Sequence, residues 1–423
     1  MIIIDWKNML RINIHQVLLF LIPIPLFIGL NLSIYNSLEQ VASKVLPISF
    51  FIIFFYTIFN TKQKIKMSII DYILIVIIIY SIIGFTYVTV INNNIFNINW
   101  LLLYFIPIIF GYIYGRILVN KFDLNNMLYV IILSTSIFSF IHILWSFFNY
   151  GVLYTFLNRG SNDIFGFFSI YQKLVSYPLF IGIVFFLLNF SKNVVKKTEK
   201  VILSIILLLE LIIVGAREPL FIFVFMGFMY LSIYINIKLV LKVWLYIFAF
   251  ISLLLLVNML TDINVFNLNI FHKFYFMFTS TNADDFSGGR LHNILHFLDY
   301  IQTLNPLFGE GFTASVQRGS AHNQWLDLLT KGGFLFLIFI FIILVISIYL
   351  SFKLRKYNKN FILLGILLIN LMFISFNINT PLRTPYTAIL IWILIGYIIG
   401  TYIQYKNLNK KRKTINETTT TRP

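Results

Sequence analysis

The sequence contains no cysteine and few charged residues. Without cysteine, the chain has no disulfides, no thiolate metal sites and no cysteine nucleophile. Only 11% of its residues are charged, and just 15 are acidic. In an ordinary soluble domain about a quarter of the residues carry a charge, so this class of protein is excluded.

Apolar residues fill most of the chain instead. They make up 59% of it and include 47 Phe and 24 Tyr. A membrane-spanning helix needs about 20 mainly apolar residues, and about twelve stretches meet this requirement. They lie at residues 17–35, 45–60, 69–91, 100–119, 127–148, 171–190, 201–216, 219–235, 243–260, 333–352, 361–377 and 386–404. The sequence therefore predicts an all-α polytopic membrane protein with about 12 transmembrane helices.

Basic residues gather in every second connection between the predicted spans and in the two terminal segments. Under the positive-inside rule this side faces the cytoplasm, so both termini are expected there. The opposite side carries similar numbers of acidic and basic residues. The formal net charge of +17 is thus explained by topology and by attraction to anionic inner-leaflet lipids, and no nucleic-acid partner is expected.

The longest segment that a bilayer would not accept is residues 261–332. We expect it to form one large periplasmic loop with short amphipathic helices, after nine spans in residues 1–260 and before three spans in residues 333–405. Residues 406–423 are a basic cytoplasmic tail, which its polar composition predicts to be disordered. The first span follows basic residues as a signal peptide does, but it lacks a convincing cleavage site, so an uncleaved helix is expected.

Arg217 lies at the outer mouth between two predicted spans, in the sequence Gly-Ala-Arg-Glu-Pro. An arginine at this depth costs free energy unless it is paired or hydrated, which makes it a candidate functional residue. Alternatively, it reaches the membrane surface and pairs with Glu218 or with Glu210.

Residues 291–304 have the periodicity of an amphipathic helix that lies on the membrane surface over the bundle. The polar side carries His292, His296 and Asp299, at a spacing that zinc ligands can have. No further ligand is evident, so no metal is expected. The apolar stripe comprises Leu291, Ile294, Leu295, Leu298, Ile301 and Leu304.

Other outer arginines are candidates for binding an anion. Arg290 comes directly before this helix and follows two glycines, and its forked donors suit a phosphate. Alternatively, it pairs with a neighbouring aspartate. Arg159, in the loop after the fifth span, and Arg318, near the end of the large loop, are further positive contacts.

His322 begins the segment His-Asn-Gln-Trp-Leu-Asp, for which Ser320 is the predicted helix N-cap. A histidine with an ordinary pKa of about 6.5 is suited to take a proton from a hydroxyl near neutral pH. Alternatively, His322 is an interfacial hydrogen-bonding residue. His142, inside a predicted span, is expected to bridge two helices.

Several short motifs together resemble the O-antigen ligase/polymerase superfamily, and within it the O-antigen polymerases (Wzy). They are Gly-Ala-Arg at 215–217, Gly289-Arg290 before a helix, Asn-Pro-Leu-Phe-Gly-Glu-Gly at 305–311, and His322-Asn323 leading to Lys-Gly-Gly at 331–333. The chain departs from the usual pattern at Ala216, where a small hydroxyl residue is expected before the arginine.

The resemblance implies a membrane glycosyltransferase that acts at the outer face of the bacterial inner membrane, without metal or nucleotide sugar. Its donor would be a growing glycan on undecaprenyl diphosphate, its acceptor a lipid-linked repeat unit, and a chain-length regulator its protein partner. His322 would be the general base, with Asn323 orienting the acceptor hydroxyl. Arg217 and Arg290, supported by Arg159 and Arg318, would bind the diphosphate. The scarcity of outer carboxylate pairs fits this chemistry better than a two-carboxylate glycosidase.

Two other functions remain open. An O-antigen ligase has the same chemistry but transfers the glycan to the lipid A core. A flippase or other transporter of lipid-linked oligosaccharides would be expected to have charged or broken helices in mid-membrane.

Overall fold

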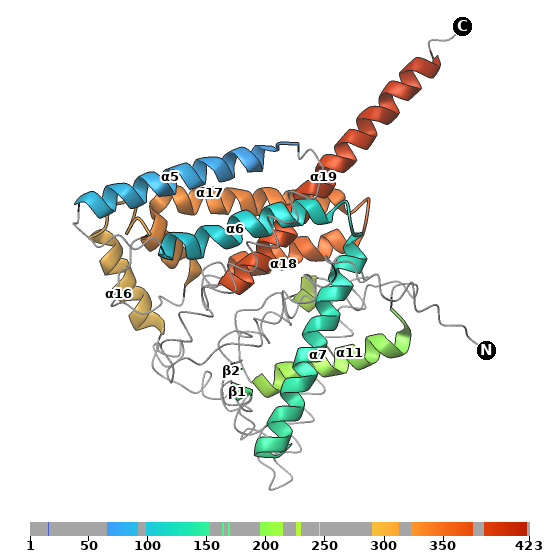
Figure 1. The fold of residues 1–423 in the computed structure, drawn as a ribbon, viewed down its shortest axis with the longest axis horizontal. Coiled ribbons are helices and arrows are strands. Elements are labelled where there is room, and N and C mark those ends of the chain that lie inside the picture. Colours follow the sequence, from blue (N-terminus) through green and yellow to red (C-terminus); the bar gives the residue numbers. More distant parts are fainter. Residues whose placement is uncertain are drawn as a thin grey trace.

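The described part of the computed structural model comprises residues 66–91, 99–152, 163–164, 168–169, 195–214, 226–229, 290–312, 323–374 and 385–420, and residues 16 and 245. Its helices are α5 (Ile69–Ile91), α6 (Asn99–Leu118), α7 (Leu124–Tyr150), α11 (Lys197–Val214), α16 (Arg290–Gln302), α17 (Gln324–Leu354), α18 (Asn360–Ile374) and α19 (Pro385–Thr420) (Figure 1). Strands β1 (Asp163–Ile164) and β2 (Phe168–Ser169) form a small antiparallel pair. The described residues are therefore almost entirely helical.

Four of these helices are long and apolar enough to cross a membrane. They span Ile69–Ile91, Leu124–Tyr150, Gln324–Leu354 and Ala388–Asn409, and shorter apolar helices cover Phe105–Leu118 and Asn360–Met372. Each overlaps a predicted span, because long apolar runs are the clearest signal in such a sequence, but α17 begins at Gln324, before the predicted start of its span at residue 333. The chain is a helical membrane protein. The predicted spans at 17–35, 45–60 and 171–190 lie outside the described residues, and those at 219–235 and 243–260 lie largely outside them.

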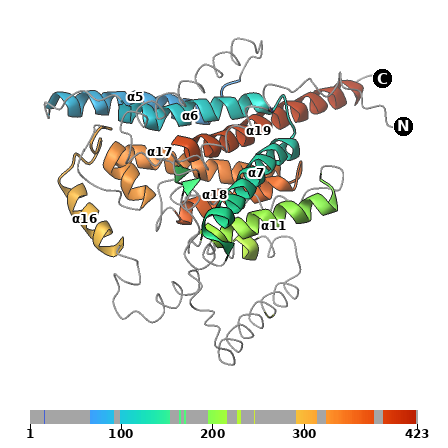
Figure 2. The ribbon, with the colours of Figure 1, turned by 60° about the horizontal axis from the view of Figure 1, so that its bottom comes forward.

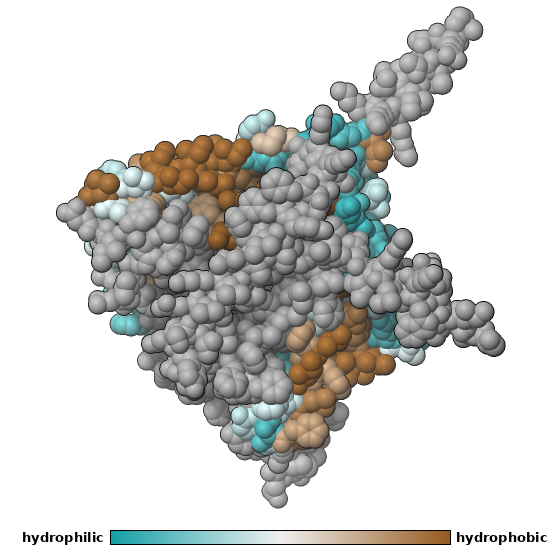
Figure 3. All heavy atoms as spheres, viewed as in Figure 1, coloured by the Kyte–Doolittle hydropathy of each residue, from teal (hydrophilic) through white to brown (hydrophobic). Residues whose placement is uncertain are grey.

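Helix α5 has one face in the protein and one face turned outward. Ile70 and Ile77 are buried, whereas Ile79 and Ile83 are exposed. Figure 3 shows a hydrophobic band along α5, with a second apolar area over α7 and α11. Exposed apolar helix faces of this size are expected where lipid replaces water.

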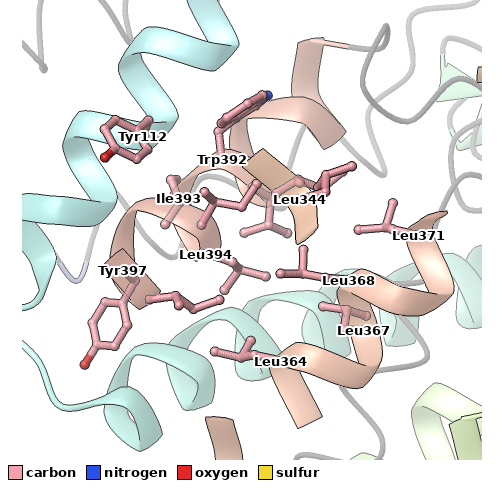
Figure 4. Close-up of a cluster of buried hydrophobic side chains, with 14 of the residues drawn as sticks. Tyr112, Leu344, Leu364, Leu367, Leu368, Leu371, Trp392, Ile393, Leu394 and Tyr397 are labelled. Atoms are coloured by element: carbon pink, nitrogen blue, oxygen red, sulfur yellow. The ribbon is translucent and has the colours of Figure 1, made fainter. Parts of the chain in front are cut away.

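The core lies where α17, α18 and α19 meet, with α6 packed beside α19. Leu364, Leu367 and Leu368 of α18 point toward Leu394 of α19, as the close-up shows (Figure 4). Trp392 is 1% exposed. Helices that are apolar on every side need protein or lipid around them, and α18 and α19 are surrounded mainly by protein.

Glycines bring α6 and α19 into close parallel contact, and in Figure 2 the two helices run beside each other. A Cβ on Gly111 would stand 2.6 Å from the carbonyl oxygen of Ile389. One turn later, a Cβ on Gly115 would overlap the carbonyl of Ile393, and Gly396 has the same relationship to Tyr112. Small residues four apart allow membrane helices to approach through their backbones, and both helices use this pattern.

An ion pair joins α5 and α6 at the end that the charge pattern assigns to the cytoplasm. The guanidinium of Arg116 donates to both carboxylate oxygens of Asp71, at 2.9 and 3.0 Å, and to the carbonyl of Lys66 at 2.7 Å. It also donates to the hydroxyl of Tyr112 at 3.1 Å. Arg116 is only 7% exposed, so it stabilises helix packing in addition to its contribution to the topology signal.

The basic tail corrects one sequence-based expectation. Residues from 406 onward were expected to be disordered, but α19 continues to Thr420 and projects beyond the bundle (Figure 1). The segment 406–420 contains neither glycine nor proline. Helix propagation adds one hydrogen bond for each residue fixed, so a polar segment without a breaker extends a helix that is already formed.

Candidate functional site

The turn at residues 305–312 follows α16 and is built around Asn305. The side-chain oxygen of Asn305 accepts hydrogen bonds from the amides of Leu307 and Phe308, at 2.9 and 3.2 Å. Its carbonyl accepts from Gly309 N at 2.7 Å. Asparagine commonly closes turns in this way. Gly309 and Gly311 have positive φ angles, which glycine adopts without steric cost.

This turn fits into a break in α17. The helix is interrupted at Gly333, whose φ is 74° and ψ −176°. In a regular helix the amide of Phe334 would bond to the carbonyl of Thr330. Instead, Phe334 N donates to the Pro306 carbonyl at 3.0 Å, and Glu310 N donates to the Thr330 carbonyl at 2.7 Å. The turn thus satisfies the backbone groups that the break exposes, as a membrane environment requires.

A second layer of contacts fixes the turn against α5. The ring of Phe308 lies between those of Tyr80 and Tyr87, with centroid distances of 5.2 and 5.3 Å. The hydroxyl of Tyr80 donates to the carbonyl of Leu307. A Cβ on Gly311 would stand 2.6 Å from the carbonyl oxygen of Gly84. Three separate chain segments therefore meet around residues 305–312.

The end of the turn is anchored in an aromatic cluster. Phe312 is 1% exposed, and its ring lies edge-on to Phe336 at 5.0 Å and to Phe105 at 5.4 Å. Its φ of 59° is uncommon for a residue with a side chain. The buried ring contacts and the hydrogen bond from Phe312 N to the Lys331 carbonyl, at 3.0 Å, maintain this conformation.

A buried ion pair lies at the centre of this assembly. The ammonium of Lys331 contacts the carboxylate of Glu310, and the hydroxyl of Tyr300 donates to the other carboxylate oxygen at 2.7 Å. Glu310 and Lys331 are 5% and 7% exposed. Breaking such a pair from one side leaves an uncompensated buried charge. The three residues come from the turn, α17 and α16, so one network holds all three elements together.

Asn323 is the N-cap of α17. Its side-chain oxygen accepts hydrogen bonds from the amides of Trp325 and Leu326, at 3.0 and 3.1 Å. The expectation that Ser320 would cap this helix is corrected: the helix begins at Gln324, three residues later than a cap at Ser320 requires. Asparagine is among the strongest N-cap residues, and its own side chain supplies the acceptor.

The start of α17 is also attached to α18. The indole N–H of Trp325 donates to the carbonyl of Met372 at 3.0 Å, and its ring lies 5.8 Å from that of Phe341. Figures 1 and 2 both place α16 at this same end of the bundle. The contacts of Trp325 therefore fix the first turn of α17 against α18.

The other predicted site residues are only partly described. Arg290 is the first residue of α16. His322, Arg217, Arg159 and Arg318 lie outside the described residues. Arg290 thus begins the helix that precedes the turn at 305–312, and Asn323 caps the helix that this turn packs against.

Helix α16 confirms the predicted amphipathic helix, and much of its apolar stripe faces outward. Leu291, Leu295 and Leu298 are exposed, while Phe297 is 7% exposed and packs inward. His292, His296 and Asp299 are exposed as well. Among the described residues no group of histidines and acids is placed to hold a metal ion. The helix therefore offers an apolar outer side to its surroundings, and Phe297 attaches it to the protein.

Sequence reasoning missed the pairing of Glu310 with Lys331. Both residues were counted only as charges on the outer side. The sequence does mark both charges as unusually placed: Lys331 precedes Gly332-Gly333 at the edge of an apolar run, and Glu310 lies between two glycines. Their spacing along the chain gives no contact information, so only tertiary structure reveals the pair.

No family model matches the chain, and the search of curated proteins found no match. The function is therefore inferred from the chain's own residues.

Proposed function

We propose that this protein is an O-antigen polymerase. In this reaction a growing glycan is transferred from undecaprenyl diphosphate to a sugar hydroxyl of a lipid-linked repeat unit. The main support is the convergence of two motifs that the sequence singled out independently. The turn at 305–311 occupies the break in α17 at Gly333, and α17 is the helix that Asn323, the residue after His322, caps.

His322 is the proposed general base. It directly precedes Asn323 in the sequence, and the side chain of Asn323 caps α17. A base positioned beside the acceptor hydroxyl would lower the activation barrier of the transfer. Since the Asn323 oxygen caps the helix, we assign Asn323 a positioning role in addition to the proposed contact with the acceptor.

The diphosphate is the proposed ligand of the arginines. Arg290 begins α16, where the amide groups and dipole of a helix favour an anion and the arginine adds two forked donors. Arg217, Arg159 and Arg318 would complete the set. Donors that stabilise the charge on a departing oxygen are each worth about 10²–10³ in rate.

This function requires a particular topology. We propose about 12 spans, both termini in the cytoplasm, and residues 261–332 in the periplasm of a bacterium whose inner membrane holds the protein. Membrane lipids and a chain-length regulator are its proposed partners. The exposed leucines of α16 would lie at the outer leaflet, beside the entry path of the polyprenyl chains.

A transporter of lipid-linked oligosaccharides is the second candidate, and one observation favours it. Helix α7 contains a buried histidine, His142, bonded to Glu210 of α11. Ionisable residues inside the membrane are common in transporters. A ligase, with a lipid A core acceptor, shares the chemistry of the proposed polymerase.

The lipopolysaccharide ladder of cells that lack this gene distinguishes the three functions. A band of core plus a single repeat unit indicates a polymerase. Bare core with accumulated lipid-linked polymer indicates a ligase. Lipid-linked single units held at the cytoplasmic face indicate a flippase.

Variants then test the site. Complementation with Arg217→Ala, Arg290→Ala or His322→Ala is expected to leave the single-unit band. His292→Ala is the matched control, because His292 lies on the same proposed loop but is exposed on α16. It is expected to restore the full ladder. A full ladder from a well-expressed His322→Ala protein would exclude His322 as the base.

A further inference from the structure

Helices α7 and α11 run side by side and are joined by two polar contacts. Near their starts, the hydroxyl of Tyr129 donates to Glu199. Farther along, His142 Nδ1 lies 2.8 Å from Glu210 Oε1. At about 1.5 Å per residue, His142 is about 12 Å from the end of α7 at Tyr150, and Glu210 about 6 Å from the end of α11 at Val214. The second contact is therefore inside both helices, nearer the end opposite Glu199.

Both members of this second contact are removed from solvent. His142 is 2% exposed and Glu210 is 0% exposed. The prediction that His142 bridges two helices is confirmed. Glu210 was considered as a partner for Arg217, but its Oε1 atom is bonded to His142. Two ionisable groups at this depth carry a large desolvation cost, which proteins seldom retain without a role.

Hydroxyl groups continue the contact along α7. Ser146 Oγ lies 3.3 Å from His142 Nε2, so a hydroxyl, an imidazole and a carboxylate follow one another. Ser139, one turn before His142 on the same helix face, is 0% exposed, and its Oγ has no hydrogen-bond partner in the described part of the chain. These polar groups thus form a short row on one face of α7.

The second carboxylate oxygen of Glu210 indicates that the His142–Glu210 pair binds a proton. Oε2 is buried and has no hydrogen-bond partner among the described residues. An ionised carboxylate accepts several hydrogen bonds, and an ionised oxygen without a partner in an apolar interior has a large desolvation cost. With neutral His142 and ionised Glu210, the pair would hold one negative charge in a low dielectric. One added proton removes this net charge, whether it resides on Glu210 or on His142.

We propose that His142 and Glu210 form a membrane-buried site for one exchangeable proton, and that the protein's activity depends on it. Proton uptake converts the pair from a net charge of minus one to zero, with no change in covalent connectivity. On the neighbouring elements, Glu199 and Lys200 are in the first turns of α11, away from the pair, and strand β1, which contains Asp163, also contacts α7. The site is independent of the function proposed above.

A simple bridge between helices is the competing explanation. A bridge needs a hydrogen bond but no titrating group, and two glutamine amides can form one. The double variant His142→Gln/Glu210→Gln therefore separates the two explanations, because it retains bonding capacity and removes the proton site. The contact between Tyr129 and Glu199 supplies the control, since Glu199→Gln changes a carboxylate on the same helix pair.

The first test is infrared difference spectroscopy on the full-length protein in lipid nanodiscs, between roughly pH 5 and pH 8, the range in which histidine usually titrates. We expect a protonated-carboxyl band that shifts in heavy water, is lost in Glu210→Gln and remains in Glu199→Gln. A spectrum of Glu210→Gln identical to that of the native protein at every pH would overturn the proposal.

The second test is complementation of whichever glycan defect follows loss of the gene. We expect the double glutamine variant to be folded and present in the membrane but to fail to complement, while Glu199→Gln complements. Full complementation by the double variant would refute the dependence on a proton. Because the spectroscopic test does not use the glycan assay, failure of the polymerase assignment and failure of the proton site are distinguishable.

Discussion

Gly333 of α17 and Leu307 of the preceding turn are in direct backbone contact: a Cβ on Gly333 would overlap the carbonyl group of Leu307. The same glycine breaks the helix, and the turn supplies replacement hydrogen bonds on both sides of the break. Gly309 contributes from the turn, since a Cβ there would stand 2.9 Å from Gly333 N. The shape of the proposed site thus depends on two glycines that allow backbones to touch.

The first prediction concerns Gly333→Ala. Both Gly333 and Gly151 have backbone angles that essentially only glycine adopts, and a side chain there costs on the order of 1–3 kcal/mol. A Cβ on Gly151 meets no atom within 4 Å, so Gly151→Ala measures the backbone cost alone. We expect Gly333→Ala to lower the thermal midpoint of the purified protein far more than Gly151→Ala does. Equal shifts would mean that the contact with Leu307 contributes nothing.

Asn323 allows its capping role to be separated from direct contact with substrate. Replacing an N-cap by alanine costs about 0.5–2 kcal/mol, whereas serine or aspartate preserves the cap. We expect Asn323→Ala to lower the thermal midpoint and to shorten the glycan ladder, and Asn323→Asp to restore both. If the aspartate variant is as stable as the native protein but has no ladder, the amide itself contacts the substrate.

Removal of one partner from the Glu310–Lys331 pair is expected to destabilise the protein severely. A buried charge left alone costs about 3–5 kcal/mol, whereas replacing both partners by apolar residues is often neutral. Lys331→Met and Glu310→Leu are therefore each expected to reduce the yield of folded protein, and the double variant to recover it. Tyr300→Phe, which removes one hydrogen bond to Glu310, should cost about 1 kcal/mol. A double variant as unstable as the worse single variant would contradict this explanation.

The contact between α6 and α19 gives a prediction away from the site. Gly115→Leu is expected to separate the helices, because even a Cβ at this position would overlap the carbonyl of Ile393. Gly400→Ala is the control: its Cβ would first meet the end of the Val119 side chain, at 2.8 Å, which is able to rotate away. Thermal midpoints in detergent would show a large loss for the first and a small one for the second. Similar values would show that close packing of these helices is dispensable.

The positions of the described helices were largely predictable. Apolar runs of about 20 residues mark membrane helices because backbone groups in lipid must bond within the helix. Helix α5 begins and ends where the sequence predicted it. The end of α19 was not predicted, since polar composition suggested disorder but says nothing about propagation from a helix that is already formed.

The features of the candidate site also differ in whether the sequence predicted them. The sequence alone determined that the chain is a helical membrane protein, that an amphipathic helix begins near residue 291, and that His142 bridges two helices, because these properties follow from local composition, periodicity and the cost of burying polar groups. Only the tertiary structure decided that the turn fills the break at Gly333, that Glu310 pairs with Lys331, and that the partner of His142 is Glu210. Residues far apart in sequence meet only when helices pack, and the pairing energy of two buried charges depends on a geometry that no spacing along the chain encodes.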